Sequence, residues 1–308
     1  MKHKTRGAAL ATAALVALIA LFGMTGCPNN AGGGGTPQAS LVSGGASLIL
    51  SADKLTIKVT VKTADSSSVT VEGCTETTLT SDSETELHAK GTTVILKGRI
   101  IKLVCSDNRL IALNVQGLSA LEELVCSDNW LTALNVQGLN ALEVLLCGSN
   151  RLTELNVQGL SALKSLGCQN NRLAELNVQG LNALKLLDCF NNQLTDLKVH
   201  NLSALESLNC QGNQLTSLNV SGCTALKTLN RSSNKIAGKF AVPAFFNSLP
   251  NRQPADDARC YLYTEKAGVP EGNLTNFTGS GVAGAFQNAK NRNWKMYKYD
   301  ANGNPVEI

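Results

Sequence analysis

The chain has 308 residues, of which 43% are hydrophobic, so it can bury a sizeable core as one large domain or two ordinary ones. Its formal net charge is +4, but Lys2, Lys4 and Arg6 supply three of the positive charges near the N-terminus. The remainder is close to neutral, which gives no indication of a nucleic-acid partner.

The first 26 residues have the pattern of an export signal. Basic residues precede an apolar run from Ala8 to Phe22, and small residues stand before Cys27. An uncleaved membrane anchor is the alternative, because an apolar stretch of about 18 residues can barely span a bilayer. The MTGC sequence that ends at Cys27 resembles a bacterial lipobox, which implies removal of residues 1–26 and lipidation of Cys27. Residues 27–44 are polar and rich in glycine, so we expect a flexible tether there.

Residues 45–100 are predicted to form a β-rich cap. The segments KLTIKVTVK (54–62), SVTVEG (68–73) and TTVILKGRI (92–100) alternate apolar with polar residues or are rich in β-branched residues. The last segment runs directly into a repeated region. A stack of repeats needs such a unit to cover its open apolar end.

Residues 101–234 repeat with a period of 21 residues in the frame L-x-C-x-x-N-x-L. Such self-similarity is typical of solenoids, and the frame is close to that of a leucine-rich repeat. We therefore expect 21-residue coils whose short strands join in a parallel β-sheet on the concave face. The repeated positions are Leu103, Leu124, Leu145, Leu166, Leu187, Leu208 and Leu229; Cys105, Cys126, Cys147, Cys168, Cys189 and Cys210; and Asn108, Asn129, Asn150, Asn171, Asn192, Asn213 and Asn234.

These repeated side chains are predicted to face inward and to hold the coils together. One coil alone is unstable, because burying its apolar side chains gains about 1.5 to 3 kcal/mol each, while ordering the backbone costs about 1 to 2 kcal/mol per residue. A buried asparagine can both donate and accept hydrogen bonds where the chain leaves the strand. In the coil that begins at Leu124, the inward set is Leu124, Cys126, Leu131, Leu134, Val136, Leu139 and Leu142.

The cysteine column is predicted to consist of small buried hydrophobic side chains. Neighbouring Cβ atoms in register would lie about 4.8 Å apart, beyond the usual range for a disulfide. A line of thiols with no histidine beside it cannot surround a zinc ion with four ligands. Cys223 is also expected in the core, whereas Cys74 and Cys260 are expected to lie about 30 Å apart and to remain unpaired.

Residues 235–308 are predicted to form an α+β cap, because the 21-residue period lapses after Asn234. The expected elements are a short helix at 241–251, a strand at 258–265, an amphipathic helix at 282–294 and a terminal hairpin that turns at Asn302-Gly303.

No motif predicts an enzyme, a cofactor or a metal. The glycines at 279–284 match the dinucleotide fingerprint in letters, but no strand precedes them and the chain ends too soon for a βαβ unit. His88 and His200 are the histidines outside the export signal. Ser161-x-x-Lys164 is a by-product of the repeat with no second motif beside it.

The positions that vary between coils are the candidate contact residues. The outward place between leucine and cysteine holds Val125 and Leu146 in two adjacent coils. Trp130 stands between arginines one coil away on either side, and these can pack on its indole for about 0.5 to 1 kcal/mol. The alternative is that Trp130 only shields its neighbours. Because tryptophan and arginine are enriched at binding hot spots, the predicted partner-binding residues are Trp130, Arg109, Arg151, Val125, Leu146 and Phe190.

The frame LxCxxNxLTxLNVxxLxAL and the lipobox-like start together resemble the leucine-rich-repeat surface lipoproteins of host-associated bacteria, especially the spirochaete type. The resemblance covers residues 101–234 and, less specifically, the flanks. It implies a lipid-anchored envelope protein, at the outer membrane or cell surface more than the inner membrane, that adheres to a protein on host or bacterial cells. The alternative is a structural envelope lipoprotein with no dedicated ligand.

Overall fold

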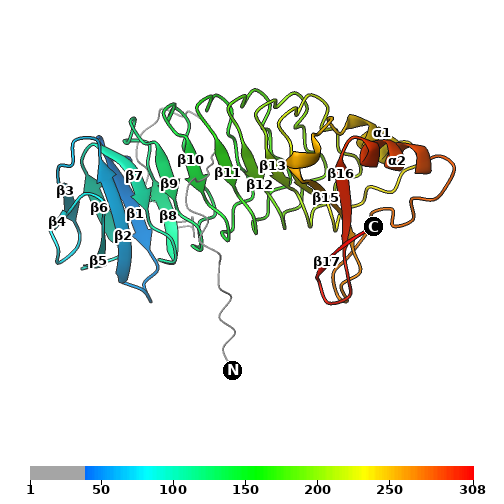
Figure 1. The fold of residues 1–308 in the computed structure, drawn as a ribbon. Helices are drawn as coiled ribbons and strands as arrows, with labels where there is room; N and C mark the ends of the chain where they lie inside the picture. Colours follow the sequence, from blue (N-terminus) through cyan, green and yellow to red (C-terminus); the bar gives the residue numbers. More distant parts are fainter. Residues whose placement is uncertain (1–38) are drawn as a thin grey trace, which may run out of the picture.

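The computed structural model describes residues 39–308, which form an elongated stack of coils with a cap at each end (Figure 1). The predicted export signal, Cys27 and residues 27–38 of the predicted tether lie outside the described residues. Residues 39–44 differ from the tether prediction, because Ala39 is buried and its carbonyl accepts a hydrogen bond from Asn114 Nδ2 at 3.1 Å. Within residues 39–308, no helix has both the length and the apolar character needed to span a bilayer.

The repeated region forms the parallel sheet that the sequence predicts. Each strand pairs with the strand one period along the chain, as Leu145 does with Leu124 on one side and Leu166 on the other. The whole inward set predicted for the coil at Leu124 is 0% to 2% exposed. The fold class, a leucine-rich-repeat solenoid, is therefore confirmed. Its strands are β7 (Ile100–Val104), β9 (Glu123–Val125), β10 (Val144–Leu146), β11 (Ser165–Gly167), β12 (Leu186–Asp188), β13 (Ser207–Asn209) and β14 (Thr228–Asn230).

The N-terminal cap extends this sheet and adds a second one. The described residues form a 12-stranded sheet and a 5-stranded sheet of order β4-β3-β6-β1-β8. β2 pairs with β7 and β1 pairs with β8, both antiparallel, so the cap covers the open end of the first coil. No sequence pattern predicted β1 or β5. The cap strands are β1 (Gly45–Leu50), β2 (Thr56–Thr63), β3 (Val69–Glu72), β4 (Thr78–Leu79), β5 (Ser83–His88) and β6 (Thr93–Lys97), and β8 (Leu110–Asn114) belongs to the first coil.

The C-terminal cap contains the predicted elements but continues the solenoid sheet. β15 pairs in parallel with β14, and β16 pairs in parallel with β15. β17 pairs antiparallel with β16 and is the edge strand of the sheet. The cap is therefore also a pair of irregular coils, which the lapse of the period did not predict. Its elements are α1 (Ala241–Ser248), the 3-10 helix η1 (Pro254–Asp256), β15 (Ala258–Thr264), α2 (Ala283–Asn291), β16 (Trp294–Tyr299) and β17 (Pro305–Glu307).

A ladder of asparagine side chains joins successive coils where the chain leaves each strand. The Asn150 amide donates to the carbonyls of Cys126 and Cys147 at 3.0 and 3.1 Å, and its Oδ1 accepts from the backbone N–H of Leu131 at 3.0 Å. One carboxamide thus satisfies backbone groups of two coils at once, which an aspartate could not do because it lacks a donor. The same bonds recur in each coil from Asn129 to Asn234.

The ladder continues into both caps. At the first coil, the Asn108 side chain bonds both the N–H and the carbonyl of Lys58 in β2, at 2.9 and 2.7 Å. In the C-terminal cap, Asn273 donates to the carbonyls of Arg231 and Leu262 at 3.0 and 2.9 Å. Asn273 therefore holds the ladder position of an irregular coil.

The residue before each ladder asparagine from Asn108 to Asn234 adopts a left-handed backbone conformation. Its φ runs from 51° at Asn191 to 65° at Gly212. Asparagine, aspartate, serine and glycine tolerate this region better than other residues. This explains why the column is restricted to these residue types although no single letter is kept in every coil: Asp107, Asp128, Ser149, Asn170, Asn191, Gly212 and Ser233.

The cysteines of the described chain are buried free thiols, as the sequence predicts for the column and for Cys223. Burial raises the pKa of Cys105 to about 12 and also raises the pKa of Cys126 well above its usual value. These thiols stay protonated at neutral pH and are poor nucleophiles and poor metal ligands.

Arg231 interrupts the cysteine column at the position one period after Cys210. It is 0% exposed, and its guanidinium lies 4.5 Å from the ring centroid of Phe245. None of its side-chain nitrogens has a hydrogen-bond partner within residues 39–308. Burial lowers the pKa of Arg231. A buried charge without a partner is destabilising, and contact with an aromatic ring offsets only part of that cost.

The asparagine ladder predicts a large stability loss for Asn150→Ala. The substitution leaves buried backbone groups of two coils without partners, so the free energy of unfolding should fall by about 1 to 3 kcal/mol. Chemical denaturation checks this against Asn140→Ala, because Asn140 is exposed and its side chain has no hydrogen bond in the described chain. Equal denaturation midpoints for the two variants would contradict the ladder.

Arg231→Met is expected to raise the melting temperature. Methionine fills a similar volume without a buried charge, and replacing buried charges by well-packed apolar side chains is neutral or stabilising by about 1 to 4 kcal/mol. Differential scanning calorimetry measures the change. A clear fall in melting temperature would mean that the guanidinium has a stabilising partner and would overturn this account.

Candidate binding surface

One row of outward side chains crosses every strand of the 12-stranded sheet. Their inward neighbours, such as Leu124 and Leu145, are fully buried, so the row lies on the opposite face. The row grades from apolar through amide to aromatic residues. In sheet order its members are Glu84, Thr60, Val104, Val125, Leu146, Gly167, Asp188, Asn209, Asn230, Tyr261, Tyr297 and Glu307.

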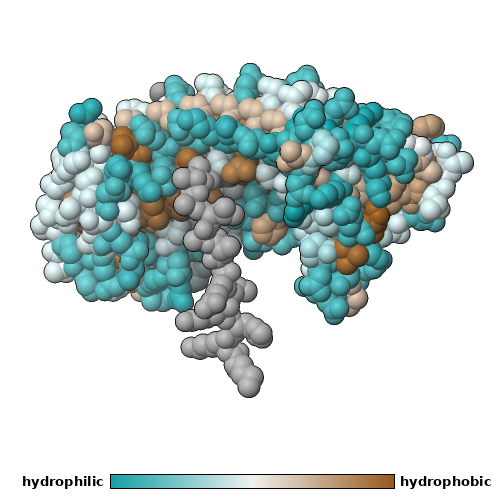
Figure 2. Space-filling view, viewed as in Figure 1, coloured by the Kyte–Doolittle hydropathy of each residue, from teal (hydrophilic) through white to brown (hydrophobic). Residues whose placement is uncertain are grey.

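The strands near the two ends of the sheet are longer than the strands of the coils. The coil strands β9 to β14 have three residues each, whereas β2 has eight and β15 has seven. Both caps consequently extend past the coils (Figure 1). In the space-filling view, small hydrophobic patches lie beside β7 to β10 and near the C-terminal hairpin, within a largely hydrophilic surface (Figure 2).

Val125 and Leu146 are in register on adjacent strands, next to Val104. All of them are half-buried. The structure therefore brings these predicted site residues together as the apolar part of the row.

Trp130 lies in a sandwich of arginines, as predicted. The Cζ atoms of Arg109 and Arg151 lie 5.5 and 4.8 Å from the indole centroid. Backbone bonds fix this column, since the N–H of Trp130 donates to the Leu110 carbonyl at 2.9 Å. Arg109 is also ion-paired with Asp53. Trp130 is half-buried, so part of the indole remains accessible.

Phe190 lies apart from both groups. It follows β12, two coils beyond Leu146, and its carbonyl accepts a bond from Asn170 N at 2.9 Å. The structure places it beside Asp188, the member of the outward row on β12, which is not among the predicted site residues. Burial raises the pKa of Asp188 to about 6, against the opposing effect of hydrogen bonds from Phe190 N and the Asn209 side chain. Its carboxyl group is therefore partly protonated in mildly acidic solution.

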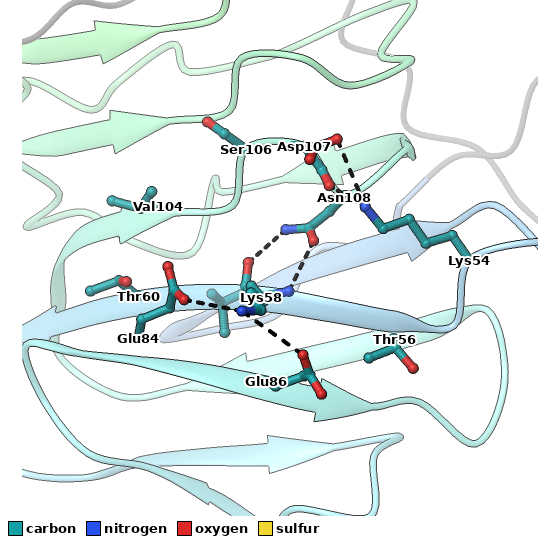
Figure 3. Close-up of a pocket in the computed structure, with 11 residues that line it drawn as sticks. Lys54, Thr56, Lys58, Thr60, Glu84, Glu86, Val104, Ser106, Asp107 and Asn108 are labelled. Carbon is teal, nitrogen blue, oxygen red and sulfur yellow. Dashed lines mark hydrogen bonds and ion pairs between the residues drawn. The ribbon is translucent and has the colours of Figure 1, made fainter. Parts of the chain in front are cut away.

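A cleft of about 440 Å³ opens where the N-terminal cap meets the first coils (Figure 3). Lys58 Nζ lies 3.5 Å from Glu84 and 4.0 Å from Glu86, so the charges on its wall pair with one another. The Asn108 side chain at its edge is engaged by Lys58. Lys58, Glu84, Glu86 and Asn108 thus already have partners within the chain. Their contacts connect the N-terminal cap to the first coil.

Within the described residues, no group of three or more histidine, cysteine, aspartate or glutamate side chains is arranged to hold a metal ion. The described surface offers three features for contact with another molecule. These are the aromatic sandwich at Trp130, the apolar strip and the amide-rich strip. Tyr261 and Tyr297, at the tyrosine end of the row, are not among the predicted site residues, because they lie outside the period and only strand register places them in the row.

Solved structures similar to this chain are leucine-rich-repeat domains. The leucine-rich-repeat domain of a Shigella effector is 22% identical, with a TM-score of 0.48 over 66% of this chain and 82% of its own. The functional domain of InlJ from Listeria monocytogenes, which includes a cysteine ladder, is 24% identical with a TM-score of 0.40 over 56% of this chain. A leucine-rich-repeat protein of Leptospira interrogans is 24% identical with a TM-score of 0.43 over 59% of this chain. The present chain spans 42% of the Listeria chain and 50% of the Leptospira chain. No protein-family model and no curated protein matches the sequence.

Proposed function

We propose that this chain is a lipid-anchored protein of the bacterial cell surface that binds a protein partner through its solenoid. The observation that carries the proposal is the exposed sandwich of Trp130 between Arg109 and Arg151. The lipid anchor and the surface location rest on the lipobox-like sequence at Cys27. Adhesion to host or other bacterial cells is the role that the resemblance of the repeat implies.

The sandwich is suited to binding because its side chains are already held in place. Packing between neighbouring arginines restricts the indole before a partner arrives, which lowers the entropy lost on association. Tryptophan and arginine in such settings are frequent hot spots. The nearby strip of Val125 and Leu146 offers apolar area for the same partner.

The charges around the sandwich indicate an acidic partner. Asp53 neutralises Arg109, but Arg151 and Arg172 in the next coils have no ion pair among residues 39–308. Two unpaired guanidinium groups one coil apart attract carboxylates and bind them in a bidentate manner. We therefore expect the partner to present acidic side chains beside an apolar pocket for the indole.

Trp130→Ala is expected to weaken partner binding while leaving the protein folded, with a stability loss limited to its arginine contacts, about 0.5 to 1 kcal/mol each. Loss of a hot-spot tryptophan costs about 2 kcal/mol or more, which is about thirtyfold in Kd. Cells that display the full chain are incubated with a panel of purified extracellular matrix proteins, and bound protein is quantified by flow cytometry. Gln193→Ala is the matched control, because Gln193 is exposed in the same column two coils beyond Arg151.

No binding by the unaltered chain, although protease added to intact cells cleaves it, would favour a structural envelope protein over an adhesive one. Equal binding by Trp130→Ala and Gln193→Ala would remove Trp130 from the site. Loss of folding with Trp130→Ala would make the residue structural.

Cys27→Ala is expected to abolish lipid attachment, because alanine has no thiol to acylate. Metabolic labelling with a palmitate analogue, followed by separation of membrane and soluble fractions, measures the effect. The unaltered chain should carry label and sediment with membranes, and the variant should do neither. Labelling of the variant at the level of the unaltered chain would refute the anchor.

A further inference from the structure

The C-terminal end of the outward row carries a stack of tyrosine rings. Tyr261 stacks on Tyr297 with centroids 5.2 Å apart and an interplanar angle of 27°. Tyr261 also stacks on Tyr299 at 5.3 Å and 14°. All of these side chains remain partly exposed. The strand register fixes them, because Tyr261 is paired with Tyr297 across β15 and β16.

Amide and hydroxyl groups adjoin this stack on the next two coils. Asn230 Nδ2 donates to Gln211 Oε1 at 2.8 Å and lies 3.4 Å from the Tyr299 hydroxyl. The Nε2 of Gln211 and the hydroxyl of Thr228 have no hydrogen-bond partner in the described part of the chain. Fixed amides and hydroxyls with free bonding capacity thus stand beside exposed aromatic rings.

The cations beside the stack are paired with carboxylates. Asp257 binds Arg259 through one oxygen and Lys295 through the other, the latter at 2.6 Å. Glu265 binds Lys298 at 2.7 Å. Glu307, in register with Tyr297, has no ion pair among residues 39–308 and accepts a hydrogen bond from the Tyr297 hydroxyl at 3.3 Å. The unpaired charge beside the stack is therefore a carboxylate, which repels a polyanion, in contrast with the unpaired arginines at Trp130.

We infer that the tyrosine end of the sheet face binds a neutral oligosaccharide. One face of a sugar ring carries C–H groups that pack on the electron-rich face of an aromatic ring. Sugar hydroxyls both donate and accept hydrogen bonds, which matches the amide of Gln211 and the hydroxyls of Thr228 and Tyr299. A ligand without negative charge also fits a surface whose cations are already paired and whose unpaired charge is the carboxylate of Glu307. This site is separate from the proposed protein-binding sandwich and does not depend on it.

Glycan binding by the purified full chain is tested on an array of neutral oligosaccharides of glucose, galactose and N-acetylglucosamine, together with sialylated and sulfated versions. The unaltered protein should retain at least one neutral probe. Tyr297→Ala should weaken that binding by about tenfold, the loss of one packed aromatic contact, whereas Tyr297→Phe should retain it because the ring face is unchanged. Phe240→Ala is the matched aromatic control, because Phe240 is 78% exposed beside α1.

A second variant keeps the test independent of the stack. Gln211→Glu preserves the oxygen that accepts from Asn230 but removes the free amide donor, so it should also weaken binding of the neutral probe. Melting temperatures confirm that each variant is folded. Binding of no probe, binding of only the sulfated or sialylated probes, or equal binding by Tyr297→Ala and Phe240→Ala would each overturn the inference. Capture of a protein but no glycan at Tyr297 would do the same.

Discussion

The asparagine ladder is the constraint on which the rest of the structure depends. Each coil must turn away from its strand after a few residues, and the backbone groups at that turn would be buried without partners. The carboxamide satisfies donors and acceptors of two neighbouring coils, so it fixes both the turn and the spacing between coils. The ladder also reaches β2 at one end and Asn273 at the other, which makes the caps part of the same hydrogen-bonded unit.

Because the ladder fixes the register, sequence positions one period apart become spatial neighbours. Inward columns are restricted by packing, as the fully buried Cys126 and Leu145 illustrate. Outward columns experience no such restriction. Their variation creates a surface that is apolar at Val125 and Leu146 and aromatic at Tyr261 and Tyr297, on one continuous sheet.

The repeated part of the fold could be predicted because many inward columns carry the same letter in successive coils, among them those of Leu124, Cys126, Asn129, Leu131, Leu134, Val136 and Leu142. The continuation of the sheet into β15 and β16 could not, since Asn273 follows Leu262 by eleven residues, whereas Asn129 follows Cys126 by three. The insertion removes the period while the ladder position survives. The left-handed conformation before each ladder asparagine was not predicted for another reason. Asp128, Ser149 and Gly212 share this backbone conformation but have different side chains, so no single letter marks the column.

The candidate site was predictable only in part. The stacking of arginines on Trp130 follows directly from the period, because residues 21 positions apart must meet. The separation of Phe190 from that cluster depends on where each side chain leaves the coil, which spacing alone does not give. Arg231 could have been found from the period, since it falls in the cysteine column, but only the structure shows that it is buried without a partner.

The register also accounts for the tryptophan itself. An arginine at position 130 would stand one coil from both Arg109 and Arg151, and like charges this close repel one another. Trp130 separates these charges and gives both a favourable aromatic face. Arg151 and Arg172 lie in adjacent coils with no aromatic residue between them and no ion pair in the described chain, so their charges repel each other. An anionic group bound between them would remove this repulsion and stabilise the column.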